Sequence, residues 1–194
     1  MVNVLATILQ MMLHVHAQTI GLRICVVVDY MLKYHSTFIG FREVPDEVSL
    51  CINISGCKHH CKGCHSPFLQ EDTGTSLNKT SLLKLLQDND GITCVAFMGG
   101  DHLPHRLVNL AAHIKYKFPN LKLAWYSGDN DINKLPSLYR FVFDYIKIGG
   151  YKEEFGPLDS VNTNQRMYKI DHSDDSLEDI TYKFQKHYET KDSD

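Results

Sequence analysis

The sequence predicts an α/β fold built on a largely parallel β-sheet. Short apolar segments typical of strands alternate with segments whose apolar residues recur at helical spacing, and short loops join them. Strands that alternate with helices in this way form parallel sheets with right-handed crossovers. The chain has 194 residues. Because a complete barrel needs about 250 residues, we expect an incomplete TIM-like barrel of about five or six mostly parallel strands with flanking helices.

The expected strands share short apolar runs, partly β-branched, that stop at a turn containing glycine or polar residues. They are expected at residues 48–54, 92–98, 121–126, 145–148 and 167–170. Ser55-Gly56 ends the first strand, and Gly99-Gly100 ends the second. Because ligands bind at the carboxyl ends of parallel strands, we expect the functional site at the edge where these loops meet.

Helices are expected between the strands. Residues 78–87 contain four leucines at helical spacing and begin at a cap residue, either Asn78 or Thr80. Residues 103–118 repeat apolar side chains at the same spacing and end at a proline. A shorter helical piece is expected over residues 132–138.

Composition and charge argue against several classes of protein. Hydrophobic residues make up 43% of the chain and charged residues 22%, close to the averages of globular proteins, so we expect a folded chain. A formal net charge of −3 offers no basic field for a phosphate backbone, so no nucleic-acid partner is expected. The apolar residues 1–18 contain Asn3, His14 and His16 and no basic start, so neither a signal peptide nor a membrane span is expected.

The cysteines are unevenly distributed. Three of the six lie within eight residues, as Cys57, Cys61 and Cys64. This crowding favours a metal site over a disulfide framework and indicates a reduced, cytoplasmic setting. The other cysteines stand singly in apolar stretches and are expected to be small core residues: Cys25, Cys51 and Cys94.

The spacing Cys-x3-Cys-x2-Cys provides three thiolates for one metal centre. A [4Fe–4S] cluster usually has four ligands, so three cysteines leave one iron with an open position, which is typical of a catalytic metal. The alternative is zinc, bound by the three cysteines and by His59, His60 or His65. Structural zinc sites usually add a second, distant cysteine pair, and the sequence has none.

The cysteine spacing and a second motif together resemble the radical S-adenosylmethionine superfamily. Gly99-Gly100-Asp101 follows an expected strand and resembles the motif that contacts the amino group of S-adenosylmethionine in that superfamily. The chemistry agrees, because glycines let the backbone approach a ligand and a carboxylate accepts hydrogen bonds from an ammonium group.

Within that superfamily the sequence is most similar to the activating proteins of anaerobic (class III) ribonucleoside-triphosphate reductases. The segments that carry this resemblance are 54–65, 97–101, 125–128, 144–149, 156–159 and 164–166. Many superfamily members have an aromatic residue before the last cysteine, whereas this chain has Gly63, as the reductase activases do.

The resemblance implies a site and a reaction. Cys57, Cys61 and Cys64 would be the catalytic, metal-binding residues of a [4Fe–4S] cluster. The residues expected to line S-adenosylmethionine are Gly63, Cys64, His65, Gly99, Gly100 and Asp101. The reduced cluster would cleave S-adenosylmethionine to methionine and a 5′-deoxyadenosyl radical, which would take a hydrogen atom from a glycine of the reductase. An electron donor such as flavodoxin or ferredoxin is a second expected partner, and the basic loop around Lys58 and Lys62 either receives it or is simply solvated.

Several alternatives remain. The chain could be another radical S-adenosylmethionine enzyme, such as a different glycyl-radical activase or a deazaguanine-type synthase, although we see no insertion that would form a substrate pocket. It could also be a zinc-binding module. Residues 164–166 (Asn-Gln-Arg) either meet the partner's glycyl-radical loop or close the fold. For Trp125 and Tyr126, packing in the core or at its rim is favoured over stacking on a cofactor.

Three parts are expected along the chain. Residues 1–30 form an N-terminal extension that is either disordered or not part of the native protein, because Met31 is an alternative start just before the motifs. Residues 31–175 form the radical S-adenosylmethionine domain. Residues 176–194 form a C-terminal helix and an acidic tail.

Overall fold

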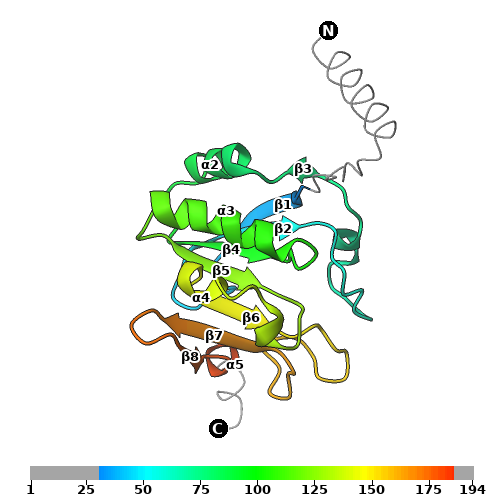
Figure 1. Cartoon of the computed structure of the whole chain (residues 1–194). Coiled ribbons are helices and arrows are strands. Elements are labelled where there is room, and N and C mark those ends of the chain that lie inside the picture. Colours follow the sequence, from blue (N-terminus) through cyan, green and yellow to red (C-terminus); the bar gives the residue numbers. More distant parts are fainter. Residues whose placement is uncertain (1–30, 186–194) are drawn as a thin grey trace, which may run out of the picture. The chain divides into compact units, whose positions relative to one another are not determined.

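A mixed β-sheet organises residues 31–185, the part of the chain that the computed structural model describes (Figure 1). Within these residues the strand order is β3-β1-β2-β4-β5-β6-β7-β8. The strands are β1 (Lys33–Gly40), β2 (Ser49–Ile54), β3 (Thr75–Ser76), β4 (Cys94–Met98), β5 (Lys122–Tyr126), β6 (Tyr145–Ile148), β7 (Arg166–Asp171) and β8 (Ser176–Asp179). Strands β2, β4, β5 and β6 are parallel, and the other pairs are antiparallel.

The predicted α/β class is confirmed, but the sheet differs from the one expected. Among the described residues it has eight strands in place of five or six, and half of them pair antiparallel at the two sides of the parallel centre. The partial TIM-like barrel is not confirmed. The five expected strands correspond to β2, β4, β5, β6 and β7.

The two longer helices predicted from the sequence, at 78–87 and 103–118, form as α2 and α3. The helical segments are η1 (Pro67–Gln70), α2 (Lys79–Gln87), α3 (Pro104–Lys117), η2 (Ile132–Lys134), α4 (Tyr139–Val142) and α5 (Tyr182–Gln185). Asn78 caps α2, because its side chain accepts hydrogen bonds from the backbone N–H groups of Thr80 and Ser81. Pro104 opens α3, where its fixed φ suits the first helical turn.

Different elements pack against the two faces of the sheet. Helices α2, α3 and α4 pack on one face (Figure 1), where large side chains such as Phe97, Trp125 and Ile146 are fully buried. The other face carries smaller side chains, including Ala96 and Ala124, and is covered in part by the β1–β2 loop and α5. Because side chains alternate along a strand, one set of strands supplies both faces.

Three features of the described residues differ from what the sequence predicts. Residues 176–194 were expected to begin with a helix, but strand β8 occupies Ser176–Asp179, and helix α5 spans only four residues. The helical piece expected over 132–138 is limited to the 3-10 turn η2. Strands β1, β3 and β8 were not predicted. The expectations for residues 1–30, including Cys25, and for the end of the acidic tail lie outside the described residues. In residues 31–185 no helix has both the length and the apolar character needed to cross a membrane.

Candidate functional site

A cavity of about 300 Å³ lies at the edge where the parallel strands end. Each of the four parallel strands contributes to its wall through the loop that follows it: Cys61 after β2, Asp101 after β4, Gly128 after β5 and Gly150 after β6. This is the edge at which ligands bind in parallel α/β folds, as expected from the sequence.

The cysteine loop forms the first wall of the cavity. Cys57, Cys61 and Cys64 are all partly exposed, and all three line the cavity. The backbone holds the loop in place, since the N–H of Cys57 donates to the carbonyl of Leu69 at 2.8 Å and the N–H of Cys64 donates to the carbonyl of Cys61 at 3.2 Å. Burial raises the pKa of the Cys57 thiol, and the nearby carboxylate of Asp101 raises it further.

Asp101 provides a fixed negative charge beside the cysteines. Its side chain is buried, and its Oδ2 accepts hydrogen bonds from Nε2 of His59 at 2.9 Å and from the N–H of Gly128 at 2.8 Å. Burial alone raises the pKa of this carboxyl, but the hydrogen bonds from His59 and Gly128, together with the Ser127 hydroxyl, outweigh burial and hold the pKa below its ordinary value. The second oxygen, Oδ1, is buried and has no hydrogen-bond partner. The carboxylate therefore has one oxygen available for a ligand.

Two glycines bring the backbone close to the cysteine loop. A Cβ atom on Gly128 would lie 2.4 Å from Cδ2 of His59, and one on Gly150 would lie 3.3 Å from Sγ of Cys61. A side chain at Gly128 would therefore displace His59 from Asp101. The cavity keeps its shape because these two positions have no side chain.

Two polar residues of the cavity wall were not among the predicted site residues. Lys147 of β6 is buried, its Nζ donates to the carbonyl of Gly149, and burial lowers its pKa to about 8. Gln165, just before β7, is also buried in the cavity wall. The signal for Lys147 was a single cation in an otherwise apolar strand, whereas Gln165 stood in the segment 164–166, for which the sequence left two roles open.

A larger groove of about 640 Å³ continues from the cavity. The two spaces share four wall residues: His65, Tyr126, Pro157 and Leu158. The rest of the groove is formed mainly by the β1–β2 loop and by α5, including Phe41 and Phe184. It therefore lies on the face of the sheet that helices α2, α3 and α4 leave uncovered.

Residues 46–137 match a family model described as a 4Fe-4S single cluster domain. The match supports an iron–sulfur protein. It covers just under half of the chain and includes the three clustered cysteines and Asp101. Searches of curated proteins and of solved structures find no match.

The cavity fits an iron–sulfur cluster better than a single zinc ion. In residues 31–185 one group of metal-binding side chains has ligand atoms within 4.8 Å of one another, His59, Asp101 and Asp129, and it contains no cysteine. Two of the three histidines considered as the fourth zinc ligand have other polar contacts, since His59 pairs with Asp101 and His60 Nδ1 lies 3.0 Å from Oε1 of Gln70, whereas His65 lines the cavity with the cysteines. Three soft thiols around a cavity match the donors of a cluster that leaves one iron open.

The structure brings most of the predicted cofactor residues together. His65 and Gly99 line the cavity with the cysteines and Asp101, whereas Gly63 and Gly100 lie next to lining residues without lining it themselves. The His65 ring stands 5.1 Å from the ring of Tyr151.

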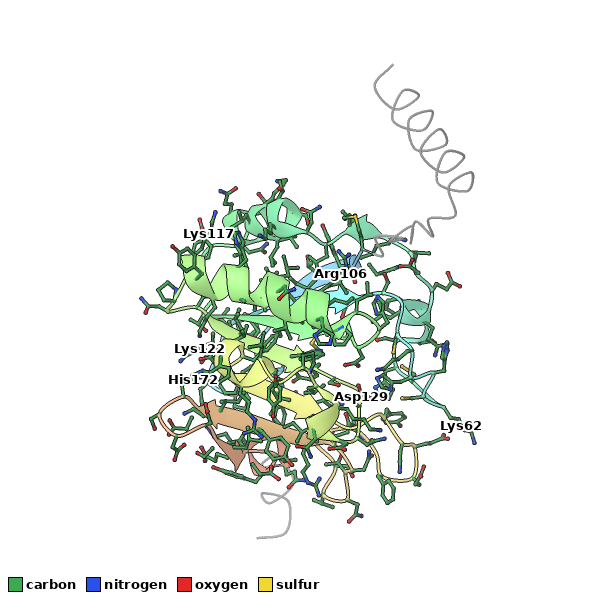
Figure 2. The ribbon with its side chains drawn as sticks, in the orientation of Figure 1. Lys62, Arg106, Lys117, Lys122, Asp129 and His172 are labelled. Carbon is green, nitrogen blue, oxygen red and sulfur yellow. The ribbon has the colours of Figure 1, made fainter. Side chains whose placement is uncertain are left out.

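The positions of further residues can be compared with the expectations from the sequence, those of an aromatic residue, two lysines of the cysteine loop and two isolated cysteines. Trp125 packs in the core, as expected, and its Nε1 donates to the carbonyl of Gly99 at 2.9 Å. Lys62 lies at the outer edge of its loop (Figure 2) with 93% of its side chain exposed, 3.9 Å from Oε2 of Glu153, and Lys58 pairs with Asp129 at 3.2 Å. Cys51 and Cys94 are buried, as expected of core cysteines.

Proposed function

We propose that this chain is a radical S-adenosylmethionine activase that generates the glycyl radical of an anaerobic ribonucleoside-triphosphate reductase. One observation carries the proposal: three half-buried cysteines share a cavity with a buried carboxylate that keeps one oxygen unpaired. This pairing supplies thiolates for a cluster and an acceptor for a ligand ammonium in the same space.

The residues of the cavity have distinct roles in this proposal. Cys57, Cys61 and Cys64 hold three irons of the cluster. Oδ1 of Asp101 accepts a hydrogen bond from the amino group of S-adenosylmethionine, and His59 keeps that carboxylate oriented and ionised. Lys147 adds a buried cation near Asp101 and Cys61 that offsets the negative charge of the thiolates.

The cluster and cofactor supply chemistry that no side chain can. When bound, the reduced cluster provides the electron that cleaves S-adenosylmethionine, and the outcome is removal of a hydrogen atom from a glycine α-carbon of the reductase. The chain itself binds and orients the reactants and shields them from water. An external electron donor such as flavodoxin or ferredoxin belongs to the proposal, because the described chain has no second cluster of cysteines.

The first test is anaerobic reconstitution of the full chain with iron and sulfide, followed by reduction and incubation with S-adenosylmethionine. We expect release of 5′-deoxyadenosine and methionine, measured by chromatography. The Cys61→Ala variant should lose at least about 90% of this release, because a cluster with two remaining cysteine ligands is poorly held. Cys94→Ala is the matched control, since Cys94 is buried in the sheet and does not line the cavity.

Two results would count against the proposal. If the wild-type chain holds its full iron content and releases no 5′-deoxyadenosine, it does not carry out radical chemistry on S-adenosylmethionine. Release of 5′-deoxyadenosine without a glycyl radical on the reductase, measured by electron paramagnetic resonance, would remove the activase and leave another radical S-adenosylmethionine enzyme.

A further inference from the structure

One edge of the sheet is left open along most of strand β1. Strand β3 pairs with β1 only at Lys33 and Tyr34, so residues 36–40 pair with β2 alone. Among residues 31–185, no backbone group of this segment bonds to any element other than β2. Its register with β2 is regular, because the irregularity of β1 lies between Tyr34 and Ser36. The segment therefore presents a regular row of unpaired donors and acceptors that can bind another strand.

The two edges of the sheet differ in charge. At the opposite edge, β8 has only four residues, among them Glu178 and Asp179, and a short charged strand protects an edge from pairing. The open segment of β1 has the sequence Ser-Thr-Phe-Ile-Gly, with neither a charge nor a proline. It therefore lacks the features that block pairing at an edge.

Two large apolar side chains are exposed along the open segment. Phe38 is 41% exposed and Ile39 is 38% exposed, although both belong to a strand of the sheet. Phe38 stands opposite Cys51, on the face with the smaller side chains, whereas Ile39 stands opposite Leu50, on the face that the helices cover. A strand that pairs along this edge covers both side chains, which a partner bound to one face of the sheet does not.

A second copy of the same segment fits this edge. When two copies pair antiparallel about a two-fold axis at Phe38, Phe38 lies opposite Phe38 of the second copy, and Ile39 lies opposite Thr37 of the second copy. Aromatic pairs stabilise adjacent strands, and β-branched residues favour strand pairing. The pairing spans residues 36–40 of each copy, because β3 covers the edge before this segment and β1 ends after it.

The charges at the two ends of the segment also fit a second copy. Arg42, just beyond the end of β1, is exposed and forms no ion pair within residues 31–185. Glu71 and Asp72 lie at the other end, in the segment that leads into β3, where Asp72 binds Lys33 at 2.9 Å. Antiparallel pairing brings Arg42 of each copy next to this acidic end of the other copy, so opposite charges meet at both ends of the interface.

We propose that this chain forms a two-fold dimer in which the β1 strands of two copies pair along residues 36–40 and join the two sheets into one. The dimer goes beyond the proposed function and does not depend on it. Strand β2 of one copy runs opposite to β2 of the other, so the two cavities open at opposite ends of the shared sheet. Each cavity therefore remains accessible to its own partner molecule.

The experiment measures the mass of the reconstituted full chain by anaerobic sedimentation equilibrium over a range of concentrations. We expect wild type to approach the mass of two chains as its concentration rises. Phe38→Lys and Phe38→Glu should each raise the dissociation constant of the dimer at least about tenfold, because the two-fold axis places like charges directly opposite each other. An equimolar mixture of the two variants should recover the dimer, because opposite charges then face each other.

Phe141→Lys is the matched control. Phe141 is 64% exposed on α4, on the helical face, and its replacement should leave the wild-type dissociation constant unchanged. A wild-type chain that keeps the mass of one chain at every concentration overturns the inference, as does a dimer that persists in both Phe38 variants. Loss of the dimer in both variants without recovery in their mixture overturns the pairing about Phe38. If wild type is monomeric and Phe38→Lys weakens binding of the reductase, the edge belongs to the reductase and not to a second copy.

Discussion

At the scale of single residues, the site depends on a carboxylate that is ionised, immobile and only half satisfied. Asp101 reaches this state because His59 and Gly128 bind the same oxygen and leave the other unpaired. A buried acceptor without a partner destabilises the empty protein by about 1–3 kcal/mol. A ligand that donates to Oδ1 recovers this free energy, so part of its affinity is built into the fold.

Replacement of Asp101 by asparagine tests this account. Asp101→Asn keeps the shape but removes the charge that a ligand ammonium needs. We expect the dissociation constant for S-adenosylmethionine to rise about tenfold or more, the value of one charge-assisted hydrogen bond. Iron content should stay at the wild-type level, because the three cysteines are intact. Isothermal titration of the reconstituted protein provides the measurement.

The control for that measurement is Asp90→Asn, because Asp90 is exposed and does not line the cavity. It should bind S-adenosylmethionine as wild type does. Equal affinity in Asp101→Asn and wild type would show that the free oxygen of Asp101 does not contact the ligand.

At the scale of secondary-structure elements, Asp144 joins one helix and two strands at the end of the sheet opposite the cavity. Its Oδ2 accepts from the N–H of Leu123 at 2.8 Å and from Nζ of Lys115 at 2.7 Å, and its carbonyl accepts from Ile170 at 2.8 Å. Lys122 and His172, labelled in Figure 2, each lie 3.4 Å from Oδ1. The residue therefore connects α3, β5 and β7.

Loss of this charge should destabilise the sheet in a pH-dependent way. Burial raises the pKa of Asp144, but the hydrogen bonds from Lys115 and Leu123 lower it by more than burial raises it. The folded pKa therefore lies below the unfolded value of about 3.9. The stabilisation is therefore present above pH ~4 and lost as pH falls through the folded pKa. Asp144→Asn should lower the free energy of unfolding by about 2 kcal/mol at pH 7. Urea denaturation of the apoprotein at several pH values measures this difference.

The difference in the free energy of unfolding between wild type and Asp144→Asn should become smaller as pH falls below about 4. A difference that stays constant with pH would show that packing, not charge, accounts for the loss. Asp88→Asn is the control, because Asp88 pairs with Lys84 on the exposed surface of α2 and such pairs contribute little.

The elements that the sequence predicted are those that bury a continuous apolar stripe. Strands β2, β4, β5 and β6 are buried along most of their length, so their composition identifies them. Strand β8, with the sequence Ser-Leu-Glu-Asp, exposes most of its side chains at the edge of the sheet. Its pairing with β7 depends on tertiary context that a local pattern does not contain.

The same limit applies to the site. The spacing of Cys57, Cys61 and Cys64 specifies a metal site by itself, because it is local in the chain. Lys147 and Gln165 line the cavity only because β6 is one of the parallel strands that end there and β7 lies next to β6. Their contribution depends on strand order, and the antiparallel pairing of β6 with β7 was not expected from the sequence.

At the scale of the whole described molecule, the two faces of the sheet have different functions in the proposed reaction. Helices α2, α3 and α4 seal one face with a core of large side chains. The other face carries the groove that leads to the cavity. Phe41 stands at this groove with 70% of its surface exposed. An exposed aromatic side chain beside a groove is typical of a protein-binding surface.

The reductase should therefore protect the groove face and leave the helical face unchanged. In hydrogen exchange of the reconstituted protein with and without reductase, we expect slower exchange in the β1–β2 loop and in the cysteine loop, because docking excludes water from them. Exchange in α2 and α3 should not change.

Phe41→Ser should weaken binding of the reductase about tenfold, the loss of one aromatic anchor at an interface. Tyr116→Ser removes an aromatic side chain that is 87% exposed on α3 and should bind as wild type. Protection confined to α2 and α3, or weakened binding in Tyr116→Ser alone, would place the partner on the helical face, where it could not reach the cavity.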